Sequence, residues 1–174
     1  NDRLQDFNLR VGLLRQTRSG RVPVSVTFYG NTAIDARDSD FFPKTSNRFS
    51  YFSQFIIMRR FSRIVSLQVA PSFSHYNIVD ESLSNNQFAV AVGGKVSISD
   101  KTAILLDYSQ PLDQNSDNPG LAIGIEMSTS SHAFQVFVGN YNGIVPQKNY
   151  MLNSNKLSEK QFLIGFNINR LWNF

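Results

Sequence analysis

The sequence contains no cysteine and no long apolar run. Without Cys, disulfide bonds, thiolate metal sites and thiol catalysis are all excluded. No stretch approaches the ~18 consecutive apolar residues that a membrane-spanning helix needs. If the protein lies in a membrane, it must cross it as a closed β-barrel, because only helices and closed barrels satisfy every backbone polar group in lipid.

Charged residues are also scarce, at 17% of the chain, which is below the roughly 25% of an average soluble domain. The net charge is +4 and the pI is about 9.5. A basic protein is a candidate for nucleic-acid binding, but Lys and Arg are scattered along this sequence and are not interleaved with aromatic residues as in a binding groove. We therefore expect no nucleic-acid partner.

The dominant positive feature is alternation of apolar and polar residues with a period of two, which predicts β-strands. It recurs throughout the chain, and most runs are long enough for a tilted strand to cross a bilayer. We expect one all-β domain over residues 1–174. The nine predicted strands lie at 7–13, 22–29, 49–60, 65–73, 88–98, 104–109, 121–127, 134–139 and 162–174.

The predicted connections alternate in length. Short connections lie at 17–21, 62–63, 99–101 and 129–131, and long polar connections lie at 35–47, 77–85, 111–119 and 142–158. Short periplasmic turns alternating with long extracellular loops are typical of bacterial outer-membrane barrels. We therefore predict an antiparallel up-and-down transmembrane β-barrel in the bacterial outer membrane. The main competing fold is a soluble lipocalin-like barrel.

The polar face of the strands consists mostly of Ser, Ala, Gly, Gln and Asn, which suits the interior of a modest barrel better than a solvated surface. Counting residues along the hairpin places Lys95 close to Asp107. We expect the interior charges to pair and to fill the lumen, and the alternative is a role in selectivity. The predicted lumen charges are Arg10, Arg60, Lys95, Asp107 and Glu126.

Aromatic residues collect near the predicted strand ends, as in the interfacial girdles of barrels. The residues predicted to form girdles are Tyr29, Tyr51, Tyr76, Tyr108 and Tyr141 beside the long connections, and Trp172 at the opposite end. The last strand resembles the C-terminal signal that the barrel-insertion machinery reads. Its apolar positions are Phe162, Ile164, Phe166, Ile168, Trp172 and Phe174.

Strand parity gives one further expectation. If the last strand ends in the periplasm, the first of nine strands starts outside the cell, whereas bacterial single-chain barrels have an even number of strands. We therefore expect an odd number of further strands upstream, or strands supplied by another chain.

Several segments in this order resemble a family of outer-membrane β-barrels of unknown function from Bacteroidetes-type bacteria. They are Leu13–Gln16, Val22–Val26, Phe88–Val90 with Gly93 and Gly94, His132–Val136 and Gly165–Arg170. The resemblance spans nearly all of the chain, and it implies the same fold and location. Members of that family extend further at the N-terminus by several strands. The resemblance implies no catalytic or ligand residues.

The sequence offers few candidate catalytic or metal-binding residues. His75 and His132 fall at opposite strand ends, so neither a triad nor a shared metal site is expected, and we predict no enzyme activity, metal or cofactor. The interior apolar residues favour a partly filled lumen: Phe52, Ile56, Met58 and Phe137. We expect a structural or accessory subunit that contacts membrane lipid and other outer-membrane or periplasmic proteins. The alternative is a small-solute pore or transporter, and an outer-membrane enzyme is less favoured.

Overall fold

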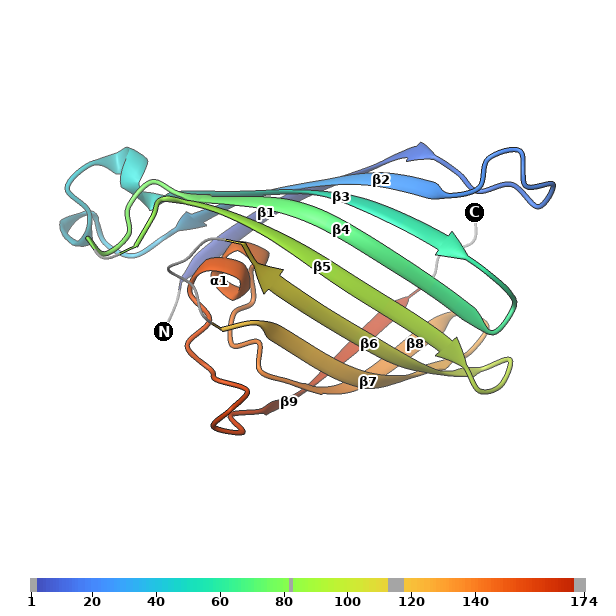
Figure 1. Ribbon diagram of the computed structural model, residues 1–174. Coiled ribbons are helices and arrows are strands. Elements are labelled where there is room, and N and C mark those ends of the chain that lie inside the picture. Colours follow the sequence, from blue (N-terminus) through green and yellow to red (C-terminus); the bar gives the residue numbers. More distant parts are fainter. Residues whose placement is uncertain (1–2, 82, 113–117, 171–174) are drawn as a thin grey trace.

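The computed structural model shows a single antiparallel sheet of nine strands in the order β1 to β9 (Figure 1). It describes residues 3–81, 83–112 and 118–170. The strands are β1 (Leu4–Leu14), β2 (Ser25–Asp35), β3 (Phe49–Arg60), β4 (Val65–Tyr76), β5 (Asn86–Ser97), β6 (Thr102–Pro111), β7 (Gly120–Ser128), β8 (His132–Gly139) and β9 (Leu163–Arg170). The all-β, up-and-down architecture predicted from the alternation is confirmed.

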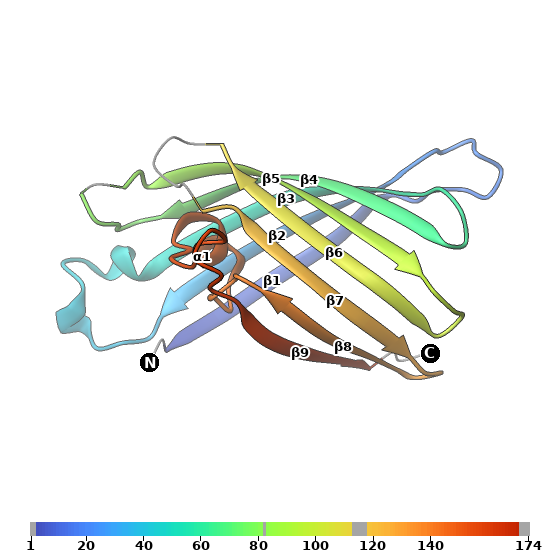
Figure 2. The same cartoon turned by 60° about the horizontal axis from the view of Figure 1, so that its bottom comes forward.

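The sheet is strongly curled into a trough, with its concave side forming a half-barrel interior (Figures 1 and 2). Each strand pairs with its neighbours in sequence, and within the described ranges β1 and β9 each pair on one side only. Because β1 and β9 run in the same direction, an antiparallel closure requires an odd number of additional strands. The parity expectation therefore stays a prediction.

Apolar side chains cover the outer, convex face, and small or polar side chains cover the concave face. On the outer face, Leu9 is 61% exposed and Phe166 is 74% exposed. On the concave face, Ser74 and Ser109 are each 1% exposed. A soluble sheet would bury the first set and expose the second, whereas a membrane barrel does the reverse.

Strand boundaries differ from prediction mainly at β2. The expected start at Val22 is wrong, because Pro23 has no N–H for the ladder and β2 begins at Ser25. The strand also continues to Asp35, beyond the alternation that predicted it. Apart from Ile34, its second half contains small and polar residues on both faces, so hydropathy gives little signal there, but the backbone pairs in register with β1 and β3.

With one exception, the connections sort by length onto the two ends of the sheet, as predicted; the exception is the predicted short turn 17–21, which lies in a longer connection. Short connections join β3 to β4, β5 to β6 and β7 to β8 at one end, where the longer segment 15–24 also joins β1 to β2. The other end holds the long connections, with the 3-10 helices η1 (Ser39–Phe41) and η2 (Thr45–Arg48) and the helix α1 (Pro146–Met151). None of the helices in the described part of the chain has the length and apolar character to cross a membrane.

Candidate functional site

The connection between β8 and β9, residues 140–162, folds against the concave face of the sheet and carries α1 with it (Figure 2). We name this segment the plug. Helix α1 contacts β3, β4, β5 and β6, and Val145, Gln147 and Met151 are buried. The sequence predicts a long polar connection here, and the structure adds that the connection folds inward, because its apolar and amide side chains are buried against the sheet.

A buried hydrogen bond links the middle of the plug to β3, a strand of the surrounding sheet (called the wall below) that is distant in sequence. Gln147 Nε2 donates to Ser50 Oγ of β3 over 2.9 Å, and Gln147 is fully buried. The other amide atom, Gln147 Oε1, is buried with no hydrogen-bond partner among the described residues. This bond fixes α1 beside β3, because a buried amide is costly to leave unpaired.

An asparagine cluster holds the start of the plug to β7. The side chain of Asn140, which is fully buried, accepts a hydrogen bond from the Leu121 backbone N–H over 2.7 Å. Its amide nitrogen donates to the carbonyl oxygens of Pro119 and Asn155 at 2.8 and 3.0 Å. Asn155 returns a bond to the Asn140 carbonyl at 3.1 Å. These bonds close the plug onto itself and onto the wall.

Two tyrosines of the plug reach polar groups of the wall. The Tyr141 hydroxyl donates to Asp107 Oδ1 of β6 over 2.7 Å and lies 3.0 Å from Ser109 Oγ. The Tyr150 hydroxyl accepts from Gln54 Nε2 of β3 over 3.3 Å, and its ring packs on Phe52 with centroids 5.2 Å apart. Aromatic packing and hydrogen bonds therefore attach the plug to two separate strands of the curled sheet, β3 and β6.

The plug tyrosines are held in their neutral form. Burial raises the pKa of Tyr150 to about 12, and the charge of Asp107 adds to the effect. Burial also raises the pKa of Tyr141, again with a contribution from Asp107. Both hydroxyls therefore keep their protons throughout the physiological range.

The interior charges pair differently from the sequence expectation. Lys95 Nζ lies 2.5 Å from Glu126 Oε1, and Gln135 Nε2 donates to Glu126 Oε2 over 2.7 Å. The expected approach of Lys95 to Asp107 is wrong, because the register pairs Lys95 with Leu105 and Gly93 with Asp107. The Lys95 side chain instead extends diagonally from β5 across β6 to Glu126 of β7. Asp107 forms its hydrogen bond with Tyr141.

The other two predicted lumen charges occupy different depths. Arg10 lies over the Tyr29 ring, with its guanidinium carbon 5.7 Å from the ring centroid. No ion pair of Arg10 occurs within the ranges that the structure describes. Arg60 ends β3 at the short-turn end, where its Nε donates to the Ser62 carbonyl over 3.1 Å. Arg60 therefore belongs to the rim of the interior and not to its middle.

Two cavities line the concave face on either side of Asp107. The larger has about 530 Å³ and lies towards the short turns, among Gln68, Lys95 and Phe137. The smaller has about 330 Å³ and lies between the wall and the plug, among Arg10, Tyr29 and Tyr150. Asp107 lines both cavities, so the two compartments meet at this carboxylate.

The predicted aromatic girdle divides between the two faces. Tyr51 and Tyr108 lie on the outer face, the position that a girdle requires. Tyr29 and Tyr141 lie on the concave face, so their assignment to a girdle is wrong: Tyr29 packs on Phe52 and Tyr141 bonds to Asp107. Tyr76 is half-buried at the end of β4.

The last strand presents its apolar residues outward, as predicted. Ile164, Phe166 and Ile168 are 80%, 74% and 59% exposed. Phe162 is also exposed, just before β9. Trp172 and Phe174 lie outside the described residues, and recognition by the insertion machinery stays a prediction.

The histidines lie at opposite ends of the sheet and contact no common site. His75 hydrogen bonds to Asn86 and Asn77 at 2.7 and 2.9 Å, and His132 stacks on Phe134. In the described part of the chain, no three His, Cys, Asp or Glu side chains lie close enough together to hold a metal ion.

Sequence reasoning missed the plug itself. Its signal was present: Pro146 suits the first turn of a helix, and Val145, Tyr150 and Met151 interrupt a polar connection with apolar side chains. No hydropathy period shows that such a segment turns inward, because the partners that bury it lie on β3 to β6.

One comparison with known proteins supports a barrel fold for the sheet. The family described as "Membrane bound beta barrel domain (DUF5777)" matches residues 1–172 of the chain. No curated protein and no solved structure gave a match. Because the match covers nearly the whole sequence and the sheet has an exposed apolar outer face, the chain belongs to the membrane-bound beta barrel domain family.

Proposed function

We propose that this protein is an outer-membrane barrel with an occluded interior, which serves as a structural or accessory subunit of an envelope complex and not as an open pore or an enzyme. One observation carries the proposal: α1 and the residues around it lie on the concave face, and the plug is bonded to the sheet through Gln147, Tyr141 and Asn140. A segment fixed by buried hydrogen bonds reduces the cross-section through which a solute could pass.

The outer membrane is the location that the topology favours. The strands are 8 to 12 residues long; β8 is an example of the shortest and β3 of the longest. Most of their connections alternate between short and long. Both features are typical of outer-membrane barrels, with the short connections in the periplasm. The long-connection end, where the plug enters, then faces outward.

Planar-bilayer recording tests the occlusion. We expect the purified full chain to give no discrete current steps. A variant in which residues 142–158 are replaced by a short Gly-Ser turn should admit ions, since α1 and its contacts are removed. Discrete, sustained steps from the unmodified chain would contradict the proposal and support the alternative of a small-solute pore, which the two cavities favour.

The accessory-subunit role has a separate test. We expect the protein, extracted from native membranes in mild detergent, to migrate on native electrophoresis as part of an assembly larger than the chain refolded alone. Migration of both preparations at the same size would contradict a role as a subunit, and it would leave the occluded interior unaffected.

A further inference from the structure

The short-turn end of the sheet carries mainly positive charge. Lys and Arg are scattered in the sequence, but the up-and-down topology brings those of three connections, together with Arg59 near the end of β3, to this end. We name this set the basic rim: Arg15, Arg18, Arg21, Arg59, Arg63 and Lys101, all exposed. Among the described residues of these three connections, 15–24, 61–64 and 98–101, Asp100 is the only acidic one.

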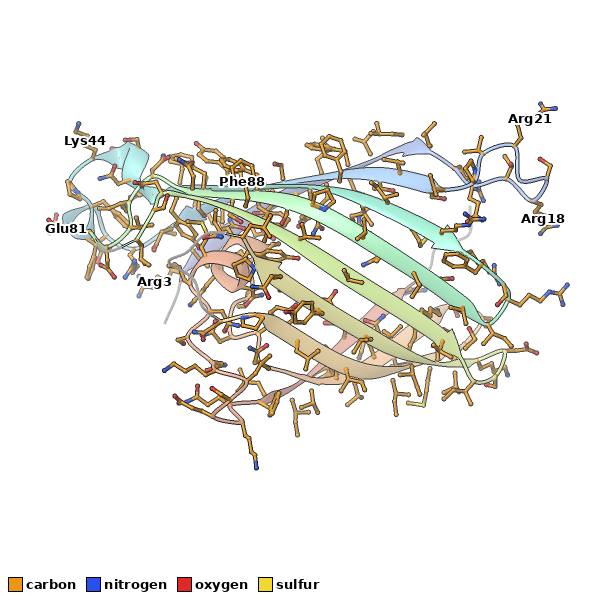
Figure 3. All side chains as sticks on the ribbon, viewed as in Figure 1. Arg3, Arg18, Arg21, Lys44, Glu81 and Phe88 are labelled. Carbon is orange, nitrogen blue, oxygen red and sulfur yellow. The ribbon has the colours of Figure 1, made fainter. Side chains whose placement is uncertain are left out.

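The opposite end has mixed charge. Figure 3 shows Lys44 and Glu81 together at the long-connection end, and Arg18 and Arg21 at the other. At the long-connection end, cations also meet acidic partners directly, as Lys156 does with Glu159 over 3.1 Å. The charge is therefore distributed asymmetrically along the axis of the trough, which uniform solubility requirements do not explain.

The cations of the basic rim are exposed, and in the part of the chain that the structure describes they are not paired with acidic side chains. None of the six forms an ion pair within the described ranges. Apolar residues lie among them: Phe61, Ile64 and Ile98 are 58%, 57% and 64% exposed. The guanidinium carbon of Arg59 lies 5.0 Å from the centroid of the Phe61 ring. Exposed apolar side chains beside long cations are typical of the membrane–water interface.

This placement indicates what the rim binds. The apolar outer band of β1 to β6 ends at the rim, so the cations lie at the level where lipid headgroups begin. Basic residues beside an anionic membrane surface are each attracted to it. We propose that the basic rim binds the phosphate headgroups of anionic phospholipids in the leaflet at the short-turn end. An acidic protein is less favoured, because the cations do not come from one loop alone: Arg15, Arg18 and Arg21 share the connection 15–24, and the other three follow the edge of the lipid-facing sheet.

The leaflet is periplasmic only if the outer-membrane orientation proposed above holds. The headgroup preference itself does not depend on that orientation, or on whether the interior conducts. Vesicles with the same composition in both leaflets therefore separate failure of this inference from failure of the proposed function.

Lipid selectivity measures the preference directly. The full chain is reconstituted in phosphatidylcholine vesicles that contain a small share of spin-labelled phosphatidylglycerol or spin-labelled phosphatidylcholine. The protein-bound fraction of each label gives its relative association constant. We expect phosphatidylglycerol to associate about fivefold more strongly at low salt. The preference should shrink above roughly 0.1 M salt, where the Debye length falls to about 10 Å.

Two variants with equal charge change locate the effect. The rim variant replaces four cations of the short turns by Gln: Arg18→Gln, Arg21→Gln, Arg63→Gln and Lys101→Gln. The control replaces four cations at the opposite end: Arg3→Gln, Lys44→Gln, Lys156→Gln and Lys160→Gln. We expect the rim variant to lose most of the selectivity and the control to keep it. Equal selectivity in the two variants, or no preference in the unmodified chain, would overturn the proposal. An acidic protein would then be the remaining candidate partner of the basic rim.

Discussion

The Tyr141 hydroxyl donates a hydrogen bond to the Asp107 carboxylate over 2.7 Å, and this bond joins the plug to β6 where the two interior cavities meet. Ser109 Oγ lies 3.0 Å from the same hydroxyl, so it supports the tyrosine from the wall. Both ends of the interaction lie in positions that the sequence alone gave no reason to connect.

Removing this hydroxyl should loosen the plug. In Tyr141→Phe, Asp107 loses its donor, and we expect the free energy of unfolding to fall by about 1–3 kcal/mol, because a half-buried carboxylate is left without its hydrogen bond. Urea unfolding of the refolded protein in micelles measures the change. Tyr108→Phe is the control, since its hydroxyl bonds to Gln110 on the outer face. Equal losses in both variants would contradict this role for Tyr141.

Gly120 makes room for the same tyrosine. A Cβ at this position would overlap the Tyr141 ring and Ser109 Oγ. We therefore expect Gly120→Ala to displace the plug and to speed proteolysis within residues 140–162, as followed by fragment mapping. Gly12→Ala is the control, because its added Cβ would meet nothing within 4 Å. A cleavage rate in Gly120→Ala no faster than in Gly12→Ala would show that the ring tolerates the Cβ.

Much of the fold follows from sequence pattern, and much of the interior does not. Alternation places outer residues such as Ile164 and Phe166 correctly, because the strand period alone decides which face a residue takes. Sequence reasoning fails for Tyr29 and Tyr141, which were assigned to the girdle by their nearness to strand ends, a feature that does not distinguish the two faces. It also fails for the partner of Lys95, since the diagonal that brings Glu126 close depends on the registers of two strand pairs together.

Tyr150 should make the protein less stable at high pH. A tyrosine of the unfolded chain titrates near pH 10, whereas burial raises the pKa of Tyr150 to about 12 in the fold. Between these values the unfolded state releases a proton that the folded state keeps, so the free energy of unfolding falls as pH rises. Urea unfolding across this window should show a smaller fall in Tyr150→Phe than in the parent. Identical pH dependence would contradict the assignment.

Neighbouring residues of β8 should respond oppositely to a new positive charge. Val136 faces outward and is 49% exposed, whereas Gln135 faces inward and bonds to Glu126. We expect Val136→Lys to destabilise the protein in vesicles by about 2–4 kcal/mol, the cost of a Lys near the middle of the bilayer. Gln135→Lys should be tolerated, because Glu126 can accept its charge. Similar costs for both would show that the outer face does not meet lipid.

Crosslinking in the membrane tests the occluded interior most directly. Because the sequence contains no native Cys, only the introduced cysteines can react. Gln147 donates to Ser50 Oγ over 2.9 Å, whereas Ser53 lies on the outer face of the same strand. With a short bifunctional thiol reagent in vesicles, Ser50→Cys with Gln147→Cys should crosslink, and Ser53→Cys with Gln147→Cys should not. Crosslinking of both pairs alike, or of neither, would contradict the placement of α1 inside the barrel.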